Sequence, residues 1–185
     1  MNMGKIEELA SLYEQHISLP WQRALSGAQR VIVVVYDKEY EKLFRARKGE
    51  FMQRTVKSGY KWEEFDCTLH FACWMAQDEY REAYFEFPED LETKLDSEFK
   101  SQTINDVQTL LRTSDENTVV ALTGVACLYG FIRISELLHS VERDIKGRLV
   151  VFFPGTKEEH NYRLLDARDG WNYLAHCIAL RGGTQ

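Results

Sequence analysis

The sequence lacks the features that mark membrane-embedded, exported and disulfide-stabilised proteins. No stretch of its 185 residues approaches the roughly 18 consecutive apolar residues of a membrane span. The N-terminus has no apolar signal region. The four cysteines (Cys67, Cys73, Cys127 and Cys177) are scattered through apolar surroundings. This pattern favours buried, reduced thiols in a cytoplasmic protein over a disulfide framework.

Signatures of catalysis and of metal binding are also missing. The chain contains no C-x-x-C, H-x-x-x-H, H-E-x-x-H or G-x-S-x-G spacing. Residues 124–130 follow an expected strand as a phosphate-binding loop would, but Phe131 and Ile132 stand where lysine and a hydroxyl residue are required. We therefore predict no catalytic residue, no metal ligand and no cofactor, which together describe a protein that is not an enzyme.

Cationic surface is scarce as well, because the formal net charge is −6 and the pI is about 5.4. Autonomous nucleic-acid binding depends on such surface, so we do not expect it. Arg45, Arg47 and Lys48 form a local basic group on an expected helix that also carries Glu39, Glu41 and Glu50. This group fits either a solvated mixed face or a nucleic-acid contact inside a complex.

What the sequence does contain is an alternation of apolar runs and amphipathic stretches. Strands are expected at residues 31–36, 61–67, 118–123 and 149–153, and the continuous apolar character of three of them predicts burial on both faces. Helices are expected at 3–17, 38–58, 68–76 and 134–145, with two helices or one bent helix over 88–113.

This alternation predicts an α/β fold in which residues 1–185 form a single domain. The sheet should be mainly parallel and Rossmann-like, with helices on both faces. The amphipathic helix within residues 1–17 should pack on this domain. Residues 162–166 and 174–180 should add a C-terminal edge strand or hairpin.

Ligands of such sheets usually lie beyond the carboxyl ends of the strands. Asp37, Asp66, Gly124 and Gly155 occupy these positions in the expected sheet. Asp37 suits a helix cap better than a magnesium ligand, because the partner phosphate loop is missing.

One C-terminal segment combines charged and aromatic residues of the types that dominate protein interfaces. The predicted partner-binding surface comprises Tyr162, Arg163, Arg168, Asp169, Trp171 and Tyr173. An internal scaffold, with arginines paired to aspartates and Trp171 capping the core, is the alternative interpretation. The two interpretations are compatible.

Several phrases of the chain resemble the BrxB family of BREX phage-defence systems. The most specific are Arg-Leu-Val-Val-Phe-Phe-Pro-Gly at 148–155 and Asn-Tyr-Arg-Leu-Leu-Asp-Ala-Arg-Asp-Gly-Trp-Asn-Tyr at 161–173, and the resemblance extends from about residue 19 to about residue 178. It implies a cytoplasmic bacterial defence component, encoded with a large ATPase, an adenine-specific DNA methyltransferase and the phosphatase-like protein PglZ. An adaptor or assembly factor that docks onto PglZ is the function it favours. The alternative is a degenerate nucleotide-binding or nucleotide-sensing domain in the same complex.

Overall fold

A twisted sheet of parallel strands forms the centre of the molecule. The structure is a computed structural model that describes residues 4–159, 161–165 and 171–180. The strands lie in the order β2 (Lys61–Asp66), β3 (Thr118–Thr123), β4 (Arg148–Glu158), β1 (Val31–Tyr36) and β7 (His176–Ala179), and all of these neighbours pair in parallel. The predicted α/β class with a mainly parallel sheet is confirmed. The likeness to a Rossmann fold lies in this layering, because the strand order differs from the common doubly wound orders.

The burial of each strand follows its sequence. Every residue of β1 and β3 is buried, as is β4 from Arg148 to Gly155. Strand β2 has four charged residues among its six and no buried residue, which suits its place at the edge of the sheet.

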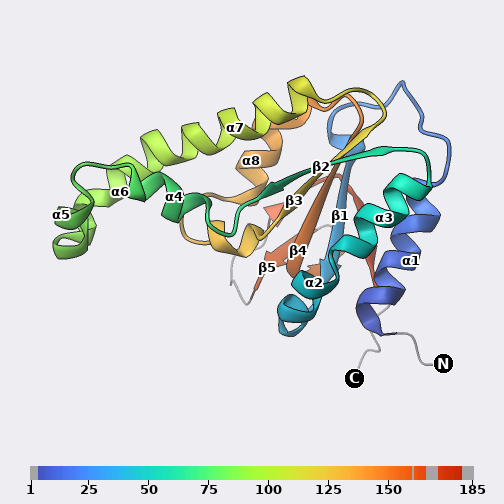
Figure 1. The fold of residues 1–185 in the computed structure, drawn as a ribbon, viewed down its shortest axis with the longest axis horizontal. Coiled ribbons are helices and arrows are strands. Elements are labelled where there is room, and N and C mark those ends of the chain that lie inside the picture. Colours follow the sequence, from blue (N-terminus) through green and yellow to red (C-terminus); the bar gives the residue numbers. More distant parts are fainter. Residues whose placement is uncertain (1–3, 160, 166–170, 181–185) are drawn as a thin grey trace.

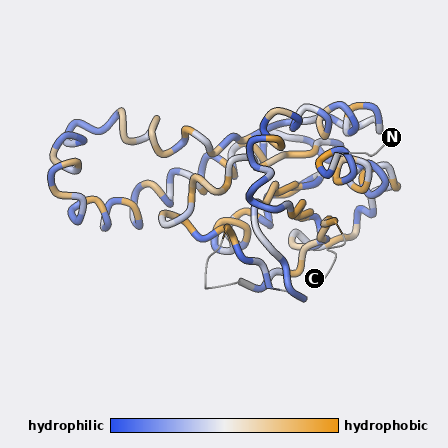
Figure 2. Tube along the Cα trace, turned by 90° about the horizontal axis from the view of Figure 1, so that it is seen from below, coloured by the Kyte–Doolittle hydropathy of each residue, from blue (hydrophilic) through white to orange (hydrophobic). Residues whose placement is uncertain are grey.

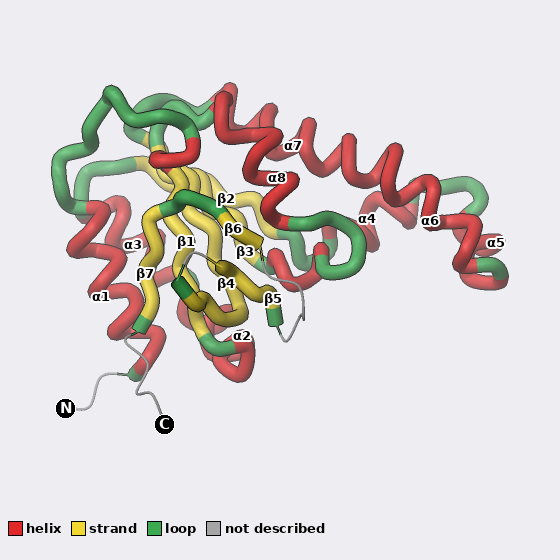
Figure 3. The backbone as a smooth tube through the Cα atoms, turned by 180° about the vertical axis from the view of Figure 1, so that it is seen from behind, coloured by secondary structure: helices red, strands yellow, loops and turns green. Residues whose placement is uncertain are grey.

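Helices cover both faces of the sheet (Figures 1 and 3). Helices α1 (Lys5–Ile17), α2 (Glu41–Arg47) and α3 (Gly49–Lys57) pack on one face, and their core includes Phe44, Phe51 and Phe152. Helices α7 (Lys100–Thr113) and α8 (Ile134–Val141) pack on the other face, together with the 3₁₀ turn η6 (Glu142–Asp144). The predicted buried stripe of the N-terminal helix is confirmed.

The single helix expected over residues 38–58 is wrong. The segment forms a 3₁₀ turn, η2 (Lys38–Tyr40), then α2, then α3, with Lys48 between the two helices. Because the helix axis changes direction there (Figure 1), the two halves do not share one buried stripe. Asp37 does cap this segment, since its carboxylate accepts a hydrogen bond from the Glu39 amide at 3.0 Å.

The chain between β2 and α7 projects away from the sheet. It contains α4 (His70–Ala76), α5 (Arg81–Glu86), the 3₁₀ turn η3 (Pro88–Asp90), α6 (Leu91–Lys94) and the π-helical turn η4 (Leu95–Phe99). We call residues 76–98 the arm. In Figures 1 and 2 the arm extends well past the helices that cover the sheet.

The π-helical turn joins the arm to α7 and settles the alternatives for residues 88–113. The backbone N–H of Lys100 bonds the carbonyl of Leu95, five residues earlier, so η4 contains one residue more than an α-helical turn. This extra residue lies between two apolar stripes of the sequence, Leu91–Leu95–Phe99 and Ile104–Val107–Leu111, whose spacing places them about one residue out of phase. The segment after η3 is one helix with a bulge.

The C-terminal part supplies both an edge strand and a hairpin, as predicted. Strand β4 runs on past the sheet and pairs in antiparallel fashion with β5 (Asn161–Leu164), which pairs with β6 (Trp171–Asn172). The edge strand is β7, beside β1. A Cβ atom at Gly155 would lie 2.0 Å from the Arg163 carbonyl, so only glycine permits this close pairing.

Two short 3₁₀ segments, η1 (Ala28–Arg30) and η5 (Val125–Leu128), complete the described elements. Within the described ranges, no helix has the length and apolar character that crossing a membrane requires.

Candidate functional site

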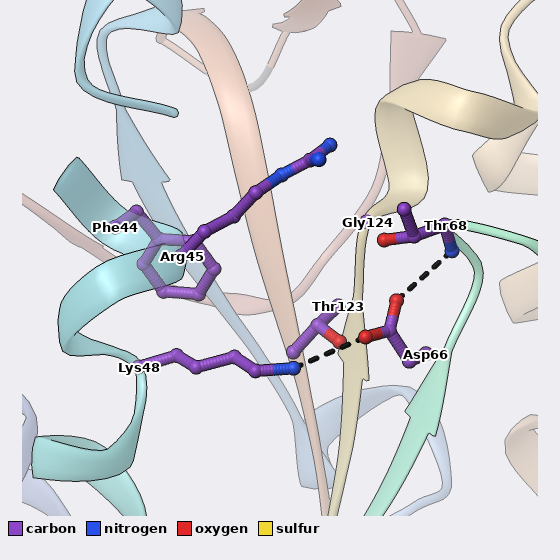
Figure 4. A pocket seen from close by; sticks show the side chains of 7 residues that line it. All are labelled: Phe44, Arg45, Lys48, Asp66, Thr68, Thr123 and Gly124. Carbon is purple, nitrogen blue, oxygen red and sulfur yellow. Dashed lines mark hydrogen bonds and ion pairs between the residues drawn. The ribbon is translucent and has the colours of Figure 1, made fainter. Parts of the chain in front are cut away.

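A small pocket lies where chemistry was expected, at the carboxyl ends of β2 and β3 (Figure 4). Its volume is about 240 Å³. Helix α2 faces the two strand ends across it. The lining residues are Phe44, Arg45, Lys48, Asp66, Thr68, Thr123 and Gly124. Of the four positions expected at this edge, Asp66 and Gly124 line the pocket, whereas Asp37 caps η2 and Gly155 pairs with β5.

Gly124 allows β2 and β3 to end close together. Its φ of +65° lies in the left-handed region, and a Cβ atom there would lie 2.5 Å from Thr68 Oγ1 and 3.0 Å from Asp66 Oδ1. Strand β3 therefore ends in a tight turn at Gly124. Thr68, in contrast, does not cap α4: that helix begins at His70, and the Thr68 amide donates to Asp66 at 2.9 Å.

The ionic groups of the pocket bind one another. Lys48 Nζ lies 2.5 Å from Glu64 Oε1 and 3.1 Å from Asp66 Oδ2, and Thr123 Oγ1 donates to Glu64 at 2.7 Å. Burial alone would raise the pKa of Asp66, but hydrogen bonds from Thr68 and the ammonium of Lys48 lower it below its usual value. Burial would lower the pKa of Lys48, but its contacts with the carboxylates of Glu64 and Asp66 raise it. Both shifts favour the charged forms of Lys48 and Asp66 at neutral pH.

Arg45 completes the electrostatics of the pocket. Its Nε donates to Glu41 at 2.8 Å, and this contact is the main reason that the pKa of Arg45 is raised. Two cations thus face the three carboxylates of Glu41, Glu64 and Asp66. Lys48 joins the end of α2 to β2, whereas the pair of Arg45 and Glu41 lies within α2. This balance of charge does not favour the binding of a phosphate.

The basic group predicted on this helix is a mixed face. Arg45 and Lys48 bind the carboxylates just described, and Arg47 Nε lies 3.3 Å from Glu50. The three side chains therefore serve ion pairs within the chain, as the simpler of the two interpretations expected.

The cysteines divide by environment. All four are free, and Cys67 is buried, which raises the pKa of its thiol to about 12. Cys127 and Cys177 are half-buried, whereas Cys73 is exposed on α4. The prediction of buried thiols is right for Cys67 and wrong for Cys73.

The C-terminal residues predicted to bind a partner separate into three groups. Tyr162 and Tyr173 are buried and pack into the core beside α8, and the Tyr173 hydroxyl donates to Glu142 at 2.7 Å. Arg163 is half-exposed, with its guanidinium 3.9 Å from Glu158. Arg168 and Asp169 lie outside the described residues, and of Trp171 only the backbone pairing with Tyr162 is described. The partner surface there stays a prediction.

The arm exposes aromatic side chains, a surface that was not predicted from the sequence. None of residues 76–98 is buried, although the segment contains two tyrosines, two phenylalanines and two leucines. Phe85 is 74% exposed, Tyr80 67% and Phe87 49%. The sequence does contain a signal for this surface. Acidic and aromatic residues alternate at residues 78–87, and this pattern differs from the apolar stripe of a helix that packs on a core.

A groove runs along the base of the arm, between α4 and the η4–α7 helix. Its volume is about 470 Å³. The groove is mainly polar and is lined by His70, Cys73, Trp74, Gln77, Asp78, Glu98, Gln102 and Asp106. The structure thus defines an α/β protein with an ion-paired pocket at its strand ends and an arm that exposes aromatic side chains.

Comparison with known proteins specifies the family. A family model described as BREX protein BrxB matches residues 69–176, which is more than half of the chain. The chain therefore belongs to the BrxB family and is a component of a BREX defence system. The matched range contains the whole arm. No curated protein and no solved structure was found to match the chain.

Proposed function

We propose that this protein is a non-enzymatic adaptor of the BREX complex that binds the phosphatase-like component PglZ. The large ATPase and the methyltransferase are further candidate partners. The arm supports this proposal, because three aromatic side chains, Tyr80, Phe85 and Phe87, are exposed there in a folded segment. Aromatic residues in such positions are the usual anchors of protein interfaces.

The exposed rings of the arm leave apolar surface in contact with water. An aromatic side chain removes about 150–250 Å² from water when it is enclosed, and burial of apolar surface is worth about 25 cal/mol per Å². In the isolated chain, Phe85 stays 74% exposed and Phe87 49% exposed, so much of this free energy is not gained. A partner that covers them would recover that free energy. We therefore place the principal contact with PglZ on the arm.

Co-purification and affinity measurement with purified PglZ test the proposal. The variant Phe85→Ala/Phe87→Ala removes two exposed rings from the arm. We expect its affinity to fall roughly thirtyfold, which corresponds to the loss of about 2 kcal/mol typical of an aromatic anchor. The control is Met52→Ala/Val56→Ala, which removes two exposed apolar side chains from α3 and should leave the affinity unchanged. Equal affinities of both variants would contradict the assignment to the arm.

A second contact is proposed at the segment predicted from the sequence. The charge exchange Arg168→Asp/Asp169→Arg and the truncation Trp171→Ala should each weaken the same complex. If both variants fold and bind PglZ as the wild type does, this second contact does not exist, and the role of the arm is unaffected.

Nucleotide sensing gains no support from the pocket. Ligand sites for small molecules usually measure about 300–1,000 Å³, whereas this pocket measures about 240 Å³, and its lysine, Lys48, is already paired with Glu64 and Asp66. We expect no heat of binding in calorimetry with ATP or a deoxynucleoside triphosphate at millimolar concentration. A saturable heat that is lost on Lys48→Ala would restore this function.

A further inference from the structure

The charge of the molecule is concentrated in the arm. Residues 78–98 contain nine acidic and two basic residues, against a formal net charge of −6 for the whole chain. The rest of the protein is therefore close to neutral. The arm combines its negative charge with the exposed rings of Tyr80, Phe85 and Phe87.

The base of the arm already shows which group this surface accommodates. Lys94 forms ion pairs with Asp78 and with Glu98, the latter at 3.6 Å. Its Nζ also lies 6.0 Å from the centroid of the Trp74 ring and 5.7 Å from that of Tyr84. Carboxylates and aromatic faces thus converge on one ammonium group. This is the arrangement by which proteins bind lysine and arginine side chains.

The groove beside Lys94 continues the same chemistry. Trp74, Asp78 and Glu98 line it, and Asp106 adds a further carboxylate. Beyond the groove, Glu86 and Glu89 are exposed on either side of Phe87. A ligand that follows the arm from α7 to its tip would therefore meet carboxylates and aromatic rings alternately.

We infer that the arm docks against a cationic face of a partner protein, one that places lysine or arginine side chains in the groove and covers Phe85 and Phe87. This inference rests on the proposed function and specifies the chemistry of the partner. The charge of the arm opposes a nucleic-acid phosphate backbone, so the occupant is a protein surface. Complementary charge should accelerate association and make the affinity depend on salt.

The test uses the full-length chain and purified PglZ at two salt concentrations, with affinity as the readout. Glu86→Lys/Glu89→Lys reverses two exposed charges of the arm that stand beside Phe87. At low salt we expect this variant to bind at least about tenfold more weakly than the wild type. The difference should shrink as salt screens the interaction.

The matched control is Glu8→Lys/Glu39→Lys, which makes the same change of charge at exposed positions on α1 and η2, away from the arm. Its affinity should stay within about twofold of the wild type. Thermal unfolding of both variants verifies that each is folded.

Each outcome has a distinct meaning. Wild-type affinity of Glu86→Lys/Glu89→Lys at low salt, with weakened binding of Phe85→Ala/Phe87→Ala, would overturn the cationic partner and retain the arm as a contact. Equal losses in the acid variant and its control would also overturn it, because the effect would then come from net charge alone. If wild-type protein does not bind PglZ, the proposed function fails first, and the inference fails with it.

Discussion

The sheet and the arm treat apolar residues in opposite ways. Phe152 on β4 is fully buried, and the centroid of its ring lies 4.8 Å from the ring centroids of both Phe44 and Phe51. Phe85 in the arm is 74% exposed, although it too lies in regular secondary structure. The difference shows that folding of this chain depends on the sheet and its helices. The apolar residues of the arm are available for another purpose.

The largest expected effect contrasts these two phenylalanines. Phe152→Ala should lower the free energy of unfolding by about 3–5 kcal/mol, because it leaves a cavity among packed rings. Phe85→Ala should change it by no more than about 0.5 kcal/mol, since the ring is exposed. Urea unfolding of the two variants measures both values. Similar losses in both would mean that the arm has a core of its own, and the contrast would be lost.

Gly124→Ala offers a sharper test of how the sheet is built. The new Cβ would sit 2.5 Å from Thr68 Oγ1 on a backbone with φ of +65°, so a loss of about 1–3 kcal/mol is expected. Gly49→Ala is the matched control, because nothing lies within 4 Å of a Cβ there. Residue 49 opens α3, where alanine should add up to about 1 kcal/mol. Unfolding experiments in which both changes destabilise equally would contradict the geometry of the strand ends.

A smaller effect on the free energy of unfolding should depend on pH and arise between α1 and β7, outside the arm. The His16 ring on α1 stacks on the His176 ring of β7, with 3.7 Å between centroids. Burial lowers the pKa of His16 to about 4, with further contributions from His176 and Arg148, and burial also lowers the pKa of His176. An unfolded histidine has a pKa of about 6.5. The stacked pair therefore contributes its full stability above pH 6.5 and loses it as the pH falls towards 4.

The expected loss between pH 7.5 and pH 5 is about 1 kcal/mol, allowing for solvent screening of these half-buried rings. His16→Phe keeps a stacked ring without a titratable proton and should reduce this pH dependence. Urea unfolding at the two pH values provides the measurement. An unchanged pH dependence in His16→Phe would place the sensitive groups elsewhere.

Much of the sheet was predictable because the sequence signals for its strands are local. Short continuous apolar runs such as those of β1, β3 and β4 are typical of buried strands. Asp37 and Gly124 have local roles at strand ends, a cap and a tight turn, for which aspartate and glycine are the usual residue types. The break at Lys48 was not predictable, since Leu43, Phe44, Phe51, Met52 and Val56 fit one helical stripe. Which of these five are buried depends on the direction of α2 relative to the sheet.

The arm shows a second limit of sequence reasoning. Leu91, Leu95 and Phe99 have helical spacing, yet only Phe99 is buried. Periodicity indicates that a helix has an apolar side, but not whether that side meets the core of its own chain or a partner. The same limit applies to the C-terminal segment, where the residue types indicated an interface but Tyr162 and Tyr173 belong to the core.

Hydrogen exchange of the protein with and without PglZ tests the central claim most directly. In the isolated chain, backbone amides of residues 76–98 should exchange much faster than those of β1 and β4. On addition of PglZ, we expect the backbone amides of the arm to exchange much more slowly and those of the sheet to change little. Protection confined to other segments, with the arm exchanging as fast as before, would contradict it.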